Sequence, residues 1–130
     1  MKKGLKIIFS VVGVGLFLFS IMLFILLNGM DQAQTIQISQ IDLSKTDDGI
    51  YLGKYETARW SNTIEVTIMD HKITKIKVLD DVLIPMDGLS ERLYNSVIYN
   101  QSLDVDIETG TTITSKAYLK AIENALEERK

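Results

Sequence analysis

An uninterrupted apolar stretch near the N-terminus most constrains how this chain can fold. The 24 residues from Ile7 to Met30 carry no charge and consist mainly of Ile, Val, Leu, Phe, Met and Gly. As a helix they would extend for about 36 Å, which exceeds the roughly 30 Å hydrocarbon core of a bilayer. We therefore predict that residues 1–30 form a basic N-terminus followed by one transmembrane helix in the lipid bilayer.

A cleaved signal peptide is the alternative, because Lys2, Lys3 and Lys6 resemble the basic start of such a peptide. The apolar core of a signal peptide is usually only about 7–15 residues long, and no A-x-A-like cleavage site follows Asn28. The length therefore favours an anchor in the cell membrane. By the positive-inside rule the lysines place the N-terminus in the cytoplasm, and the following residues are extracellular or periplasmic.

The chain beyond the apolar stretch is acidic. All 17 acidic residues lie from Asp31 onward together with 11 of the 14 basic ones, giving a formal charge of 11 − 17 = −6. Without a basic stripe we expect no nucleic-acid partner. The absence of cysteine excludes disulfides, thiolate metal sites and a lipoprotein anchor, and the single histidine argues against a histidine-based zinc site.

Two parts are expected outside the membrane. Residues 31–47 are polar and are interpreted as a stalk that sets the distance from the bilayer, with one short strand at Thr35–Ser39. Apolar side chains are set into this stalk at Ile36, Ile38, Ile41 and Leu43. Residues 48–130 then form one small domain.

Hydrophobic alternation predicts three strands in that domain. The first covers Ile50–Glu56, and the second covers Thr63–Met69, where apolar and polar residues alternate strictly. The dipeptide Asp70-His71 is a hairpin turn, and Lys72–Leu79 is the return strand. The apolar phase slips within this return strand, between Ile73 and Ile76, which indicates a bulge.

After the strands, apolar residues recur at the spacing of an α-helix. Asp80–Gly88 is a loop, Ser90–Asn100 an amphipathic helix, and a last helix begins near Ser115 and gives way to a solvated end at Glu127–Lys130. The fold class is therefore α+β, a small antiparallel sheet with two helices. A domain of this size buries little surface, so a bound cofactor would help to stabilise it.

A threonine-rich segment before the last helix carries the candidate chemistry. Gly110 permits a positive φ or a close backbone approach, and Thr114 or Ser115 can cap the helix. Free amides and the positive end of the helix dipole would make this loop an anion site. A hydroxyl-rich start of an ordinary helix is the alternative.

This segment resembles the D-x-x-[ST]-G-A-T-x-[ST]-S signature of the FMN-binding domain family, which includes the flavin-carrying C and G subunits of the sodium-pumping NADH:quinone reductase and Rnf complexes. A second element, Asp48–Gly53, resembles the family's D-G-x-Y-x-G strand, and the resemblance covers about residues 48–128. The residues at the defined positions of the signature are Asp106, Thr109, Gly110, Thr111, Thr112, Thr114 and Ser115, and all except Thr111 match it.

The resemblance implies a covalent cofactor. The family's signature threonine, here Thr112, is esterified by the phosphate of FMN through a flavin transferase that uses FAD and releases AMP. Asp106, Thr109 and Gly110 match the element that the transferase recognises. Thr111 departs from the family, which prefers alanine, so this residue could crowd the transferase or offer a second acceptor.

An aromatic bed for the flavin ring is expected among five residues, although ordinary packing is the alternative for each. Tyr51 is preferred because it lies in the matched strand, and Trp60 is interpreted as an exposed contact for a partner. The five are Tyr51, Tyr55, Trp60, Tyr94 and Tyr118.

These features together predict an electron-transfer flavoprotein domain rather than a self-standing enzyme, since no acid–base constellation is evident. Its partners would be the flavin transferase and membrane redox proteins. Two alternatives remain: a module that binds or senses FMN non-covalently, and a membrane-anchored assembly subunit without flavin.

Overall fold

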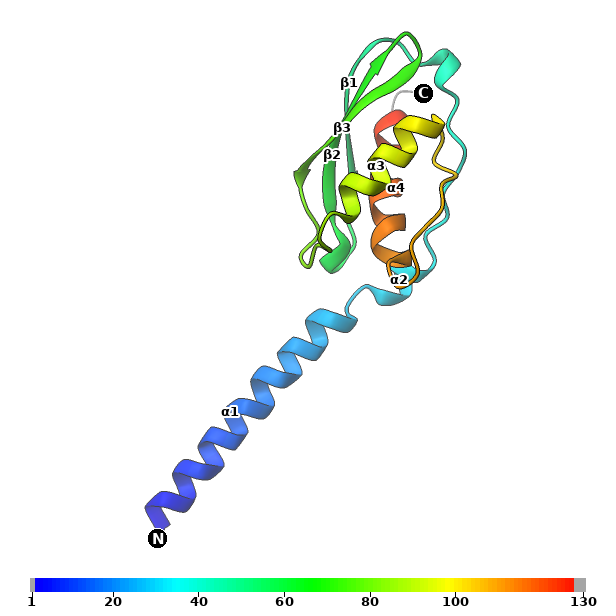
Figure 1. The fold of residues 1–130 in the computed structure, drawn as a ribbon. Helices are drawn as coiled ribbons and strands as arrows, with labels where there is room; N and C mark the ends of the chain where they lie inside the picture. The colour runs from blue at the N-terminus through cyan, green and yellow to red at the C-terminus, as the bar shows by residue number, and fades with distance from the viewer. Residues whose placement is uncertain (1, 128–130) are drawn as a thin grey trace.

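The computed structural model describes residues 2–127 and shows an isolated helical rod joined to a small α+β domain (Figure 1). This confirms the predicted fold class. The elements in chain order are α1 (Lys2–Leu27), α2 (Met30–Gln34), β1 (Gly49–Tyr55), β2 (Asn62–Met69), β3 (Lys72–Asp80), α3 (Leu89–Asn100) and α4 (Thr112–Glu127), with short 3-10 turns η1 (Leu43–Lys45) and η2 (Ala58–Trp60).

Helix α1 is long and apolar enough to cross a membrane, and none of its residues is buried in the protein. A signal sequence would share these properties. The helix ends at Leu27, and Gly29 has a φ of +77° that separates it from α2. A Cβ atom on Gly29 would lie 2.7 Å from the Ala58 Cβ, so α1 leaves the domain in close contact with η2.

The three strands form one antiparallel sheet in the order β1-β2-β3. Asp70 and His71 both have positive φ, as the central residues of a tight type I′ hairpin require. The register shifts where Thr67 pairs with Lys75 while Ile68 pairs with Ile73, which confirms the predicted bulge.

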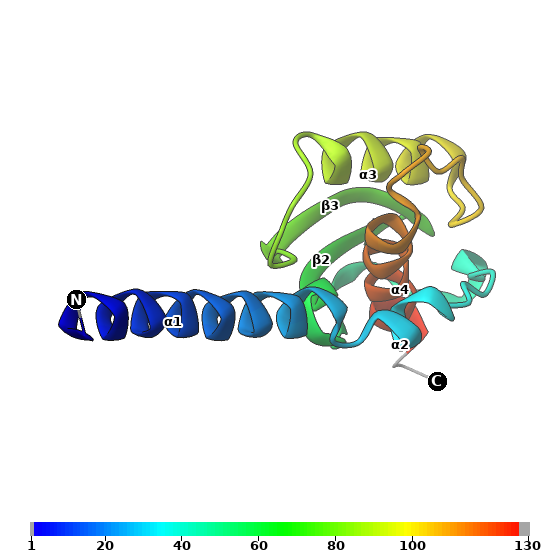
Figure 2. The same ribbon diagram turned by 90° about the horizontal axis from the view of Figure 1, so that it is seen from below.

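Helix α4 covers one face of the sheet, and α3 lies beside it (Figure 2). The alternate residues Ile64, Val66 and Ile68 of β2 are fully buried under α4. Gly53 is needed for this contact, because a Cβ there would lie 1.9 Å from the carbonyl oxygen of Ala121. Helix α4, which begins in the threonine-rich segment, is therefore packed against the sheet along most of its length.

The segment expected to be a free stalk instead packs against the domain, and no strand forms at Thr35–Ser39. Ile36 is buried, and the backbone N–H of Ser39 donates to Glu123 Oε2 of α4 at 3.0 Å. The physical reason is that the side chains interpreted as apolar insertions cover the edge of the core: Ile38, Ile41 and Leu43. We call residues 35–47 the strap.

Candidate functional site

The threonine-rich signature forms the turn that leads into α4. The helix begins at Thr112, three residues before the predicted start, and the Thr111 carbonyl accepts a hydrogen bond from Ser115 N at 2.8 Å. Thr114 and Ser115 are buried inside the first turn of the helix, at 6% and 0% exposure. The prediction that either of them precedes the helix as its cap is therefore wrong.

Gly110 shapes this turn. Its φ is +84°, and Thr111 N donates to Glu108 O at 3.1 Å, so residues 108–111 form a turn of the type II class. Nothing lies within 4 Å of the position where a Cβ would stand. The glycine is thus required by the backbone angle, and a close approach by another part of the protein plays no role.

The two neighbouring threonines have different surroundings. The Thr111 hydroxyl donates to Glu108 O at 2.7 Å and lies 3.0 Å from Ser115 Oγ. Thr112 is exposed, and its hydroxyl has no hydrogen-bond partner within residues 2–127. As the first residue of α4, Thr112 lies where backbone amides have no partner inside the helix and the dipole favours an anion.

The remaining signature residues lie in the same exposed turn. Asp106 and Thr109 are both exposed, and with Gly110 they lead directly into Thr112. The structure therefore brings these four residues together at one end of α4, as expected from their proximity in sequence.

An ion pair that the sequence did not suggest holds this turn in place. Arg92 of α3 donates to both carboxylate oxygens of Glu108, at 2.6 and 3.1 Å, and to Asp87 O at 3.2 Å. The hydrogen bond from Arg92 lowers the pKa of Glu108, and the same bond raises the pKa of Arg92. The pair joins residues 16 positions apart, so no local pattern could reveal it.

A groove of about 530 Å³ runs beside the start of α4, between the strap and the chain that leads to the signature. Lys116 and Leu119 of α4 border it. Lys116 lies four residues after Thr112, so both are on the same face of the helix. Its remaining apolar walls come from Ile36, Ile38, Leu103, Val105 and Ile107. A volume of this order suits a small organic ligand.

Tyr51 does not lie at the signature. It is buried, its hydroxyl donates to Asp47 O at 2.6 Å, and it lines a pocket of about 250 Å³ with Leu126 and Glu127. These residues are at the far end of α4, roughly 20 Å along the helix from Thr112. The matched strand motif is thus separated in space from the matched signature.

The other predicted aromatic residues also pack within the protein. Trp60 is 3% exposed, with the Arg59 guanidinium 4.2 Å from its ring centre, so the expected exposed contact is wrong. Tyr94 and Tyr118 meet edge to face at 5.8 Å, and burial raises the pKa of both. Tyr55 is half-buried against the core, and none of the five lines the groove beside Thr112.

The family model of the FMN-binding domain matches residues 61–127, about half of the chain, from the start of β2 to the end of α4 and including the whole signature. The chain belongs to the FMN-binding domain family. The match begins after β1, so the Asp48–Gly53 element lies outside it. No curated protein gives a match to the chain.

The residues of this FMN-binding domain suit the two ends of FMN. An exposed hydroxyl and free helix-start amides at Thr112 suit a phosphate dianion. The adjacent groove combines apolar walls with the ammonium group of Lys116, as a flat, partly polar ring requires. The groove depends on the strap, because Ile36 and Ile38 form part of its wall.

Proposed function

We propose that this protein is a membrane-anchored, extracytosolic electron carrier whose FMN is joined through its phosphate to Thr112. The observation that carries the proposal is the exposed, unengaged Thr112 hydroxyl at the first position of α4, inside a signature matched by the FMN-binding family. Asp106, Thr109 and Gly110, in the same exposed turn, form the element offered to a flavin transferase.

Thr112 is preferred over Thr111 as the acceptor for a geometric reason. The Thr111 hydroxyl donates to Glu108 O, so reaction there would first break that hydrogen bond. FAD contains an FMN half and an AMP half joined through a diphosphate. In the proposed transfer the Thr112 oxygen forms a bond to the phosphorus of the FMN half, and the bond from that phosphorus to the bridging oxygen of the AMP half breaks. AMP leaves, and the hydroxyl proton passes to a base or to water.

The groove beside Thr112 would hold the isoalloxazine ring. Its walls exclude water from part of the ring, and Lys116 lies one helical turn from the attachment point. FMN supplies the exchange of one or two electrons when bound, while the protein orients it and adjusts its electrostatics. A lysine in the groove favours negatively charged, reduced forms of the flavin.

Helix α1 explains why such a carrier would be tethered. Outside the cytoplasm a free flavin is diluted, whereas a tethered one keeps a high effective concentration near redox partners in the same membrane. The apolar, unburied surface of α1 supports an anchor of this kind.

Intact mass of the purified protein, coexpressed with a flavin transferase, tests the attachment. We expect an FMN-sized increment on the natural chain and on Thr111→Ala, which restores the family's usual residue. We expect none on Thr112→Ala. Thr109→Ala is a useful comparison, because it alters the recognised element and leaves the acceptor in place, so it should slow attachment without abolishing it.

The contrary outcomes separate the alternatives. An increment that persists in Thr112→Ala would transfer the acceptor role to another residue, with Thr111 the first to test. Yellow protein that loses its colour on denaturation and filtration would indicate a non-covalent FMN module. A colourless, folded protein that takes up no FMN would refute the carrier proposal and favour an assembly role.

A further inference from the structure

The loop between β3 and α3 carries exposed apolar side chains that the flavin site does not use. Leu83, Ile84 and Met86 are 64%, 50% and 42% exposed, and Pro85 between them is also exposed. Four consecutive apolar residues in water are unfavourable unless something covers them. We call residues 83–86 the apolar loop.

The apolar loop is held in place by the domain on both sides. Val82 and Leu89, which flank it, are 4% and 2% exposed. The Asp81 carboxylate accepts hydrogen bonds from Val82 N and from the hydroxyl of Tyr118 in α4. The loop is thus a fixed projection on a packed base.

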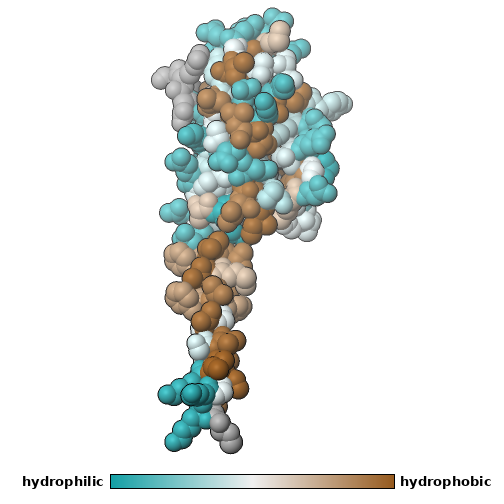
Figure 3. Space-filling view, turned by 90° about the vertical axis from the view of Figure 1, so that its left-hand side faces the viewer, coloured by the Kyte–Doolittle hydropathy of each residue, from teal (hydrophilic) through white to brown (hydrophobic). Residues whose placement is uncertain are grey.

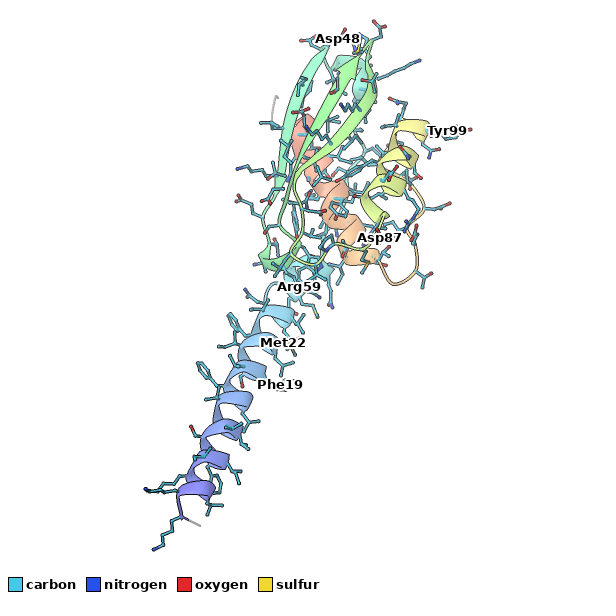
Figure 4. All side chains as sticks on the ribbon, turned by 60° about the vertical axis from the view of Figure 1, so that its left-hand side comes forward. Phe19, Met22, Asp48, Arg59, Asp87 and Tyr99 are labelled. Atoms are coloured by element: carbon cyan, nitrogen blue, oxygen red, sulfur yellow. The ribbon has the colours of Figure 1, made fainter. Side chains whose placement is uncertain are left out.

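Its position in the fold indicates what covers it. The Leu83 amide donates to Arg59 O of η2 at 2.9 Å, and η2 contacts the end of α1. In Figures 1 and 2 the loop is the part of the domain that extends furthest alongside α1, in the direction of its N-terminus. Figure 4 places Arg59 at this junction and Asp48 at the opposite end of the domain.

We propose that the apolar loop inserts into the outer interface of the bilayer that α1 spans. The inference rests on the membrane anchoring in the proposed function. The geometry favours the lipid surface as the partner that covers the loop. The exposed apolar side chains of the loop adjoin the apolar surface of α1. Figure 3 shows hydrophobic colouring on α1 and on the adjoining end of the domain. Arg59 lies at the same junction, where its guanidinium group can pair with lipid phosphate.

This contact would also fix which end of the domain faces the membrane. The loop continues into Asp87, whose carbonyl is bound by Arg92, and Arg92 pairs with Glu108 of the signature turn. The flavin attachment turn would therefore be held at the lipid-facing end, within reach of an apolar redox partner dissolved in the bilayer.

Site-directed fluorescence in the full-length chain tests the proposal. The sequence contains no cysteine, so a single cysteine at Leu83 or Ile84 can be labelled with an environment-sensitive fluorophore without background. The protein is reconstituted in phosphatidylcholine vesicles with or without nitroxide lipids, labelled either near the head group to report on the loop or in the middle of the acyl chain to report on α1. Ile50→Cys is the matched control, because Ile50 is 61% exposed and lies in β1, close to Asp48. Phe17→Cys reports on α1.

We expect lipid-dependent quenching and a blue shift at positions 83 and 84, strong quenching at 17 and none at 50. The two loop positions serve as independent reports if one variant folds poorly. Quenching at 17 with none at 83 and 84 would overturn the loop proposal while leaving the anchor intact, and would indicate a protein partner for the loop. No quenching at 17 would overturn the anchor and the loop proposal together.

Discussion

Thr111 and Thr112 show how one position in a turn separates the roles of two identical side chains. The Thr111 hydroxyl is used by the turn itself, through Glu108 O and Ser115 Oγ. Thr112 begins the helix and is exposed. The same turn depends on the positive φ of Gly110, which a β-branched residue would adopt only with strain. The chemistry proposed for Thr112 thus depends on the turn that its neighbours form.

Glu108 gives a pH-dependent prediction at this scale. Its pKa is lowered by the hydrogen bond from Arg92, so the stabilisation is present above the usual pKa of a glutamate and is lost as the pH falls through the lowered value. Arg92→Gln should raise the Glu108 pKa toward its usual value, measured by carboxyl carbon NMR during an acid titration.

Lys75→Gln removes a cation from β3, at a distance from the turn, and should leave the Glu108 pKa unchanged. If Arg92→Gln also leaves it unchanged, the ion pair does not persist in solution and some other contact must hold the turn. Because both side chains are about half exposed, high salt should weaken the effect of the pair.

The strap is the element whose behaviour departs furthest from expectation. It is bound to α4 through Glu123, which is 1% exposed and accepts from Ser39 N at 3.0 Å and Lys120 Nζ at 2.8 Å. Lys120 also donates to Gln37 O of the strap. These bonds, with the burial of Ile36, form one wall of the groove beside Thr112.

Glu123→Ala should release the strap. It leaves the Ser39 amide without its acceptor and the Lys120 ammonium with Gln37 O alone, and we expect the free energy of unfolding to fall by about 1–3 kcal/mol. Urea denaturation measures the loss, and hydrogen exchange should show faster exchange at Ser39 and its neighbours.

Glu123→Gln is the control for this change, because its amide oxygen still accepts from Ser39 N while the charge is lost. It should lose less stability than Glu123→Ala and keep the Ser39 amide protected. Equal stability of the natural chain and Glu123→Ala, with unchanged exchange at Ser39, would show that the strap does not need this carboxylate.

At the scale of the whole molecule, one apolar rod carries one compact acidic domain. The charge of −6 beyond Met30 and the three lysines before Ile7 give the two ends of α1 opposite character. By the positive-inside rule, this asymmetry supports the proposed orientation, in which the FMN-binding domain lies outside the cytoplasm. That orientation would place the carrier near membrane partners and external acceptors alike.

Cysteine labelling in intact cells tests this orientation. Asp48→Cys, at the end of the domain away from α1, should react with a membrane-impermeant maleimide, whereas Lys3→Cys should react only after the cells are opened. The chain has no native cysteine to confuse the result. Labelling of Lys3→Cys alone in intact cells would reverse the proposed topology, and a mature protein that lacks residue 3 would indicate cleavage.

The amino-acid sequence alone determined the features that depend on near neighbours. The apolar length of α1, the alternation in β2, the hairpin at Asp70-His71 and the turn glycine Gly110 are all set by residues within a few positions of one another. The signature that the family match includes is contiguous for the same reason. Short-range periodicity and backbone preference are sufficient to predict such features.

Only the tertiary structure decided which distant surfaces meet. Ile36 has polar neighbours in the sequence but is buried against the core. Trp60 is buried although it lies in the connection between β1 and β2. Tyr51 lies at the opposite end of α4 from Thr112. Arg92 meets Glu108, and Ser39 meets Glu123 across 84 positions. The burial of an apolar side chain depends on which elements pack around it, and that information lies in the assembled core rather than in any local stretch of the chain.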